Sequence, residues 1–210
     1  MDILQAGEYY RTIIERLIAH NHFGKFLFEN RTHKGAELWC MRNMCLFTDQ
    51  FYIVYGLTKL VVVDKTTGFV LKIPFLGVCL NYCDEEEAIY HRASECGFEN
   101  IFARCEKAFS IEQDKAKINF YIMEYAEVSQ TRISSYIQEY YPDIGEKYNI
   151  SPLGIDECVV YELLKRVLGE EKYLLICAFL EEEGVNDIHG GNIGFKNGEL
   201  VLVDYSGYMG

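Results

Sequence analysis

The chain has 210 residues, a formal net charge of -12 at pH 7 and 50% hydrophobic residues. This length and apolar content suffice for one or two lobes, each with a packed core. The negative charge argues against a general nucleic-acid binder, because binding to phosphate backbones needs concentrated Lys and Arg. No apolar stretch reaches membrane-spanning length and the N-terminus lacks a signal-peptide pattern, so we expect a cytoplasmic protein without a membrane partner.

The cysteines give no sign of a metal centre. All eight are spread along the chain without a CxxC pair or another zinc-ligand spacing. In a chain without a secretion signal, we expect reduced and mostly buried thiols.

Residues 1–45 are expected to form an N-terminal helical extension. Within residues 8–29, apolar side chains recur at helical spacing, with a break near Asn21 and His22. From residue 46 the pattern changes to β-branched and aromatic runs, which predict strands over residues 51–55, 60–64 and 69–73. The turn Lys65-Thr66-Thr67-Gly68 between the last two runs predicts a hairpin.

A helix is expected to begin near Asp84, with acidic residues in its first turn, and to end at Gly97. Two more strands are expected over residues 101–108 and 118–125, separated by a polar turn at residues 113–115. Residues 46–125 are therefore predicted to form one lobe, built from a hairpin, a helix and two further strands.

Helices dominate residues 126–210. They are expected over residues 133–141 and 156–183, the second stretch as two helices that meet near Gly169. Pro142 and Pro152 are expected to bracket a loop. Asn197-Gly198 predicts a hairpin turn near the C-terminus. The change in composition near Ala126 marks the expected boundary between two lobes.

Lys72 lies within an apolar strand, where an unpaired ammonium group is costly to bury. It needs a partner or an anion, unless it lies at a strand edge and extends to water. The following helix offers Glu85, Glu86 and Glu87, and Glu86 shares a face with the apolar positions three, four and seven residues later. Glu86 is therefore the preferred partner; in the alternative interpretation, all three acids only cap the start of the helix.

The most informative segment runs from Asp187 to Asn192 and is followed by an apolar run into Asp204. An Asp and an Asn on one tight loop can face the same cavity, and an Asp at the end of a strand can face it too. These oxygens suit a hydroxyl nucleophile and Mg²⁺ beside a nucleoside triphosphate. Two alternatives are a glycine-rich loop whose polar residues only make turns, and a hydrolytic metal site that includes His189.

The spacing Asp187-x-x-x-x-Asn192, with an apolar strand that ends at Asp204, resembles the catalytic and metal-binding segments of the protein kinase superfamily. The sequence Val70-Leu71-Lys72-Ile73 resembles its phosphate-binding strand, and the order hairpin, helix, two strands resembles its small lobe. The resemblance implies a bilobal α+β fold, with an antiparallel-sheet small lobe over residues 46–125 and a truncated helical large lobe over residues 126–210.

The resemblance also implies roles for the site residues. Lys72 would hold the phosphates of ATP and pair with Glu86, and Asp187 would act as base or orient the attacking hydroxyl. Asn192 and Asp204 would bind Mg²⁺.

Further positions follow from the same resemblance. Met123 would line the back of the adenine pocket, with backbone contacts to the nucleotide at Glu124 and Ala126. Gly56 would offer backbone to phosphate from the turn between the first two strands. His189, as an accessory residue, stands where many protein kinases have a lysine, and in this the loop resembles that of aminoglycoside and choline phosphotransferases.

Three departures from the kinase pattern are visible. The turn at residues 55–59 has one glycine, not three; Val185-Asn186 replaces the usual His-Arg; and Asp204-Tyr205-Ser206 replaces Asp-Phe-Gly, with Gly207 one place late. The sequence given ends at residue 210, well before the large lobe of a full kinase would end. In this it resembles minimal kinase-like proteins of bacteria, phages and effectors, some of which need a host partner.

The expected function is transfer of the γ-phosphate of ATP to a hydroxyl with Mg²⁺, on Ser or Thr of a protein in preference to a small molecule. A protein substrate or an activating partner is expected, in the cytoplasm or in a host cytoplasm if the protein is an effector. Two alternatives stay open. One is a pseudokinase that binds a nucleotide or a protein without transfer, and the other is a small-molecule phosphotransferase.

Overall fold

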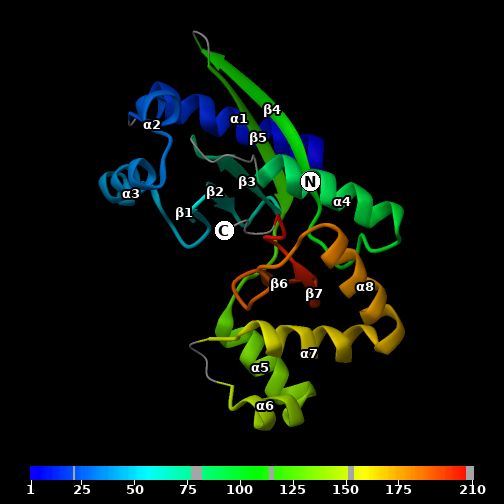
Figure 1. Ribbon diagram of the computed structural model, residues 1–210. Coiled ribbons are helices and arrows are strands. Elements are labelled where there is room, and N and C mark those ends of the chain that lie inside the picture. The colour runs from blue at the N-terminus through cyan, green and yellow to red at the C-terminus, as the bar shows by residue number, and fades with distance from the viewer. Residues whose placement is uncertain (21, 77–81, 114–115, 151–153, 207–210) are drawn as a thin grey trace. The chain divides into compact units, whose positions relative to one another are not determined.

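A computed structural model describes residues 1–20, 22–76, 82–113, 116–150 and 154–206 (Figure 1). The chain forms two compact units: the first contains Met1–Glu87 and Arg104–Tyr125, and the second contains Ala88–Ala103 and Ala126–Gly210. Both helices and strands are present, so the predicted α+β class is confirmed. Six positions that entered the predictions lie outside the described residues: Asn21, Cys79, Asp114, Lys115, Pro152 and Gly207.

The first unit is built on a five-stranded antiparallel sheet in the order β1-β2-β3-β5-β4. The strands are β1 (Phe51–Tyr55), β2 (Lys59–Asp64), β3 (Phe69–Pro74), β4 (Cys105–Gln113) and β5 (Ala116–Glu124). The predicted hairpin between β2 and β3 is confirmed, with Asp64 paired to Phe69 across the turn. Gly68 has a φ of 75° there, a conformation that glycine adopts at little cost.

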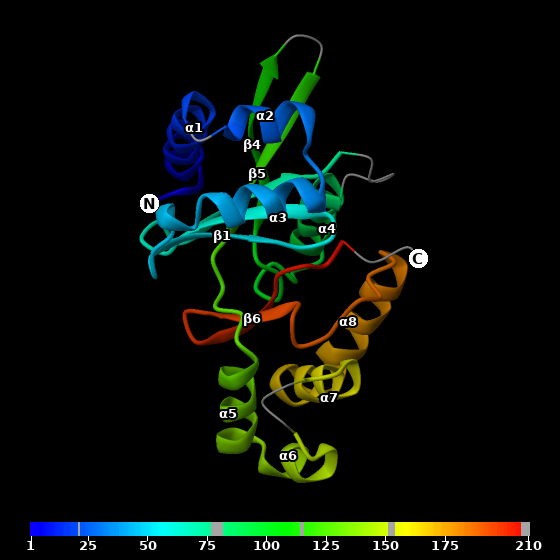
Figure 2. The ribbon, with the colours of Figure 1, turned by 90° about the vertical axis from the view of Figure 1, so that its left-hand side faces the viewer.

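Helices α1 (Ile3–Ala19), α2 (Phe23–Glu29) and α3 (His33–Arg42) belong to the same unit, and the short helix η1 (Met44–Leu46) follows them. The break predicted near residue 22 is present between α1 and α2, whereas α3 was not predicted as a separate helix. Helix α1 packs against β3, β4 and β5, and α3 packs against β1 and β2 (Figure 2). Helices and sheet share one hydrophobic core, which includes Tyr10, Phe23, Trp39, Leu60 and Phe120.

Tyr10 ties α1 to the hairpin. Its ring is fully buried, and its hydroxyl donates to the Phe69 carbonyl at 2.7 Å and accepts from the Asp64 N–H at 3.0 Å. Burial raises the pKa of Tyr10 to about 12. The N-terminal helices are therefore part of the structure that carries the sheet.

Helix α4 (Tyr82–Glu95) starts in the first unit and continues into the second. It begins two residues before the expected Asp84, and Gly97 follows it with a φ of 77°. Its first turn carries Asp84 and Glu85, as the helix dipole favours.

The second unit contains helices α5 (Gln130–Tyr140), α6 (Pro142–Tyr148), α7 (Glu157–Leu168) and α8 (Glu170–Glu182), and the hairpin of β6 (Ile193–Lys196) and β7 (Glu199–Leu202). The predicted division at Gly169 and the predicted turn at Asn197-Gly198 are both confirmed.

Two predictions of local structure are wrong. Strand β4 begins at Cys105, because residues 101–103 pair with β7 instead: the Ala103 N–H donates to the Leu202 carbonyl at 2.8 Å. A short apolar run does not specify its partner strand. The expected loop after Pro142 is the helix α6, since a proline is accommodated in the first turn, where its missing N–H needs no partner.

The expectation of mostly buried thiols is also wrong for the described cysteines. Cys45, Cys96 and Cys158 are exposed and Cys177 is half-buried, whereas Cys40, Cys83 and Cys105 are buried. Cys45 lies in η1 and Cys158 in α7, and the general preference of cysteine for burial does not decide which face of a helix it occupies.

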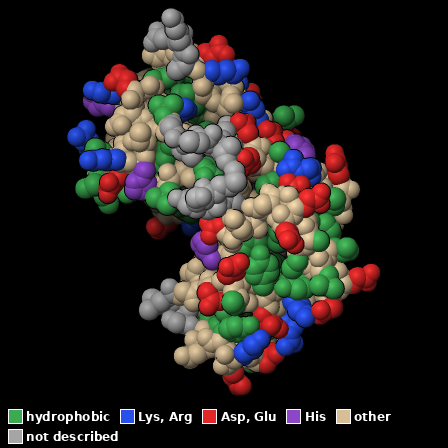
Figure 3. All heavy atoms as spheres, in the orientation of Figure 1, with side chains coloured by type: hydrophobic (Ala, Val, Ile, Leu, Met, Phe, Trp, Pro, Cys, Tyr) green, Lys and Arg blue, Asp and Glu red, His purple; other side chains and the backbone are tan. Residues whose placement is uncertain are grey.

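On the face drawn in Figure 3, acidic side chains are interspersed with Lys and Arg side chains on both units. Within the described part of the chain, no helix is both long and apolar enough to span a membrane.

Candidate functional site

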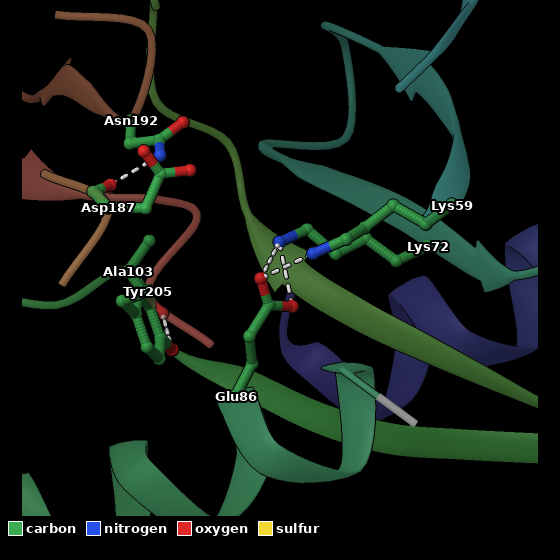
Figure 4. Close-up of polar contacts among 7 residues, drawn as sticks. All are labelled: Lys59, Lys72, Glu86, Ala103, Asp187, Asn192 and Tyr205. Carbon is green, nitrogen blue, oxygen red and sulfur yellow. Dashed lines mark hydrogen bonds and ion pairs between the residues drawn. The ribbon is translucent and has the colours of Figure 1, made fainter. Parts of the chain in front are cut away.

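In the first unit, Lys72 and Glu86 form a buried ion pair (Figure 4). The Lys72 ammonium lies 2.9 Å from both carboxylate oxygens of Glu86. The side chains are 6% and 0% exposed, which excludes a lysine that extends to water. The pairing predicted from helical periodicity is therefore present, and the catalytic roles of the two residues stay predictions.

Lys59 forms a second ion pair with the Glu86 carboxylate, and this pair was not predicted from the sequence. Its ammonium lies 2.7 Å from Oε1 of Glu86, and its side chain is 5% exposed. The β2–β3 register pairs Val61 with Lys72, so Lys59, two residues before Val61, faces the same side of the sheet. Extending the predicted hairpin register along the strands would have identified it.

The buried charges also affect a neighbouring thiol. Burial raises the pKa of the Cys105 thiol well above its usual range, and the Glu86 carboxylate raises it further. Cys105 is therefore a neutral packing residue and not a nucleophile.

The expected adenine-contacting residues of the first unit lie at the end of β5. Met123 is 1% exposed and lies between Val70 of β3 and Cys105 of β4. The Glu124 N–H donates to the Arg104 carbonyl at 2.9 Å, so this amide already has a partner within the unit. Ala126, the next expected contact, belongs to the second unit and is buried.

Gly56 lies in the β1–β2 turn. Its N–H donates to the Lys59 carbonyl at 3.0 Å and so closes the turn. A Cβ at this position would meet nothing within 4 Å, and the backbone does not require glycine. The turn tolerates side chains, unlike a loop whose glycines permit close approach of phosphate.

In the second unit, the loop from Asp187 to Asn192 is held by its own side chains. The Asn192 Nδ2 donates to the Asp187 carbonyl at 2.6 Å. A carbonyl only accepts, so this bond fixes which amide atom is nitrogen and leaves Oδ1 for another ligand. In Figure 4 that oxygen points away from the Asp187 carbonyl. The Asp187 carboxylate itself is 49% exposed.

His189 adopts a defined tautomer in the same loop. Its Nδ1 accepts from the Gly191 N–H at 2.9 Å, so the proton of the neutral ring is on Nε2. Nε2 lies 3.6 Å from Oδ1 of Asp187. A Cβ on Gly191 would lie 2.7 Å from the His189 ring, which explains the glycine. His189 thus presents an N–H toward Asp187.

The β6–β7 hairpin brings Asn192 and Asp204 to the same end of two strands. The Asn192 carbonyl accepts from the Val203 N–H at 2.9 Å, immediately before Asp204. Tyr205, which follows Asp204, is 1% exposed, and its hydroxyl donates to the Ala103 carbonyl at 2.7 Å (Figure 4). Tyr205 therefore has a structural role, since its hydroxyl anchors the residue that follows Asp204.

A further anchor of the loop was not predicted. The Gly190 N–H donates to the Ile155 carbonyl at 2.9 Å, and the Ile155 N–H donates to Gln130 Oε1 at 3.2 Å. A Cβ on Gly190 would lie 2.7 Å from both Gln130 Oε1 and Ile155 Cβ. The sequence alone gives little indication of this anchor, because Gln130 and Ile155 are far from Gly190 in the chain.

No family model and no curated protein matches the chain. Among solved structures, it matches an aminoglycoside phosphotransferase from Alicyclobacillus acidocaldarius at 12% identity and a TM-score of 0.34, over 78% of this chain and 64% of that chain. It also matches WbdD in a co-crystal with the kinase inhibitor LY294002, at 15% identity and a TM-score of 0.33, over 76% and 33%.

The chain is similar to these two solved structures at low sequence identity. It spans 64% and 33% of their lengths, which is less than two thirds of either. At this level of similarity, the roles of the site residues depend on the geometry of this chain alone.

Proposed function

We propose that this protein transfers the γ-phosphate of ATP to a hydroxyl group with Mg²⁺ as cofactor. The observation that carries the proposal is the hydrogen bond from Asn192 to the Asp187 carbonyl. It leaves an amide oxygen available beside an exposed carboxylate, at the hairpin end that also bears Asp204. The buried pair of Lys72 and Glu86 supports the proposal independently.

The donor set fits Mg²⁺. The amide oxygen of Asn192 and the carboxylate of Asp204 would hold the ion, and both are the hard oxygen ligands that Mg²⁺ prefers. When bound, the ion neutralises charge on the transferring phosphate. The protein orients the Asn192 amide for this role, because the Asp187 carbonyl accepts a hydrogen bond from the amide nitrogen and the amide oxygen points the other way.

Lys72 binds phosphate oxygens, and Glu86 fixes the position of its ammonium group. Asp187 accepts the proton of the attacking hydroxyl. The hydroxyl oxygen bonds to the γ-phosphorus, the bond to the bridging oxygen breaks, and ADP leaves with that oxygen. His189, whose Nε2 lies 3.6 Å from Oδ1 of Asp187, would help to orient the carboxylate.

The preferred acceptor is Ser or Thr of a protein. A cationic small molecule would need an uncompensated acidic surface, and the acids at α6 and α7 are partly neutralised. Asp143 bonds to Arg166, and Glu162 pairs with Lys147 at 3.2 Å. These pairs leave less uncompensated acidic charge at α6 and α7 for a cationic substrate.

Thermal unfolding with Mg²⁺-ATP tests the nucleotide part of the proposal. A ligand at a hundred times its dissociation constant stabilises by about 2.7 kcal/mol. We expect this stabilisation in the wild type, its loss in Lys72→Met, and loss of its Mg²⁺ dependence in Asp204→Ala. Lys117→Met is the matched control, because Lys117 is an exposed lysine paired only loosely with Glu112 at 3.5 Å. An unshifted wild type would refute ATP binding.

A further inference from the structure

The first unit contains a buried guanidinium group that the proposed mechanism does not use. Arg31, in the loop between α2 and α3, is 7% exposed. Its Nε and Nη1 atoms are buried and have no hydrogen-bond partner among the described residues. Buried polar atoms of this kind are rare in native proteins and call for an explanation.

The chemistry of Arg31 indicates an anion. A guanidinium stays charged in proteins, and burying its charge without a partner is costly. Burial lowers the pKa of Arg31 below its usual value. An anion at the buried donors would remove this penalty, and phosphate suits the guanidinium group well.

The loop that carries Arg31 lies beside the β1–β2 turn. The Arg31 carbonyl accepts from the Leu76 N–H at 2.6 Å, and the adjacent Phe75 N–H donates to the Thr58 carbonyl in the turn at 2.8 Å. The His33 ring lies 5.4 Å from the Tyr55 ring at the other end of the turn. Two sets of contacts therefore join this loop to residues 55–59.

The start of α3 adds positive potential at the same place. This helix of ten residues has no acidic residue in its first turn, and it begins with His33 and Lys34. The N-terminus of a helix carries partial positive charge, where acids are usually favoured. The Lys34 ammonium group, three residues after the buried Arg31, adds to the positive charge that an anion would meet here.

We propose that Arg31 is a phosphate-binding residue that acts with the β1–β2 turn. The inference rests on the proposed function, under which the phosphate belongs to ATP. It accounts for a turn with a single glycine, whose Gly56 N–H is engaged with Lys59. In this chain a guanidinium from the N-terminal helices replaces the backbone amides that a glycine-rich turn supplies to phosphate.

Calorimetric titration of Arg31→Met and Arg31→Gln with ATP, adenosine and inorganic pyrophosphate tests the proposal. We expect both variants to bind ATP and pyrophosphate at least tenfold more weakly than the wild type, and adenosine equally well. Arg11→Met is the matched control: Arg11 also has a buried Nε without a partner, but its guanidinium lies 5.1 Å from the Phe109 ring centre. Its affinities should equal those of the wild type.

The outcomes separate this inference from the proposed function. A folded Arg31 variant that binds pyrophosphate and ATP as the wild type does would overturn the inference and leave ATP binding intact. A wild type that binds pyrophosphate through Arg31 but not ATP would retain the phosphate site, with free phosphate as the source, and refute the proposed function. If the variants do not fold, thermal unfolding of the wild type with pyrophosphate provides the test. A wild type that pyrophosphate does not stabilise would refute the proposed phosphate site.

Discussion

Glu86→Gln removes the charge of the buried carboxylate while it keeps the size of the side chain. Glu86 accepts contacts at 2.7, 2.9 and 2.9 Å from two ammonium groups whose side chains are 5% and 6% exposed. Removing one partner of a buried ion pair costs about 3–5 kcal/mol. For a chain of this size, that loss lowers the melting temperature by about 6–20 °C.

Lys72→Met should cost less, because Glu86 keeps Lys59 at 2.7 Å. We expect about 1.5–3 kcal/mol, the scale of hydrogen bonds to a charged group. The asymmetry between the two variants follows from two lysines sharing one carboxylate. Glu87→Gln, one residue along the same helix, is the control: its amide oxygen can still accept the Lys107 N–H, which lies 2.7 Å from Glu87 in the wild type.

Urea unfolding followed by tryptophan fluorescence measures these differences. Trp39 is the only tryptophan in the chain. It is 5% exposed and lies 4.8 Å from the Phe23 ring in the core of the first unit, so its emission reports on the unit that contains Glu86. Equal losses of stability in Glu86→Gln and Lys72→Met would refute the shared-carboxylate account, as would a loss in Glu86→Gln no greater than that in Glu87→Gln.

Three further predictions concern both units. Tyr10→Phe should lower the free energy of unfolding by about 1–3 kcal/mol. The pKa of Tyr10 in the folded protein is about 12, above its ordinary value of 10.0, so its contribution to stability is complete below pH 10 and is lost as the pH rises toward 12. The stability of the variant should therefore fall less steeply over this pH range. Gly190→Ala should destabilise by about 1–3 kcal/mol and Gly56→Ala by less than about 0.5, as melting temperatures will test. Asp187→Asn should slow phosphate transfer by about 10²–10⁴-fold with ATP affinity retained, and His189→Ala should slow it less, as initial rates will test.

Local patterns predicted much of the first unit. β-branched runs and the turn before Gly68 predicted β2 and β3, and helical periodicity selected Glu86 among three neighbouring acids. These predictions succeeded because strand alternation and helical repeat are set by residues close in sequence. The same logic, extended across the hairpin, would have identified Lys59.

Contacts between distant segments could not be predicted in the same way. Residues 101–103 pair with β7, and the Phe102 ring contacts the rings of Phe179 and Tyr205, which are more than 70 residues away in the sequence. Arg31 also gave no sign in the sequence, since an arginine between two helices is usually exposed. Its burial depends on how the N-terminal helices pack on the sheet.

Transfer of radiolabel from the γ-phosphate of ATP tests the central claim most directly. Wild type and Asp204→Ala would each be incubated with Mg²⁺ and a lysate of the native host, and labelled protein would be measured. We predict labelled protein with the wild type and none above background with Asp204→Ala. Equal labelling by both proteins, or no labelling by the wild type with any divalent metal, would contradict phosphate transfer by this site.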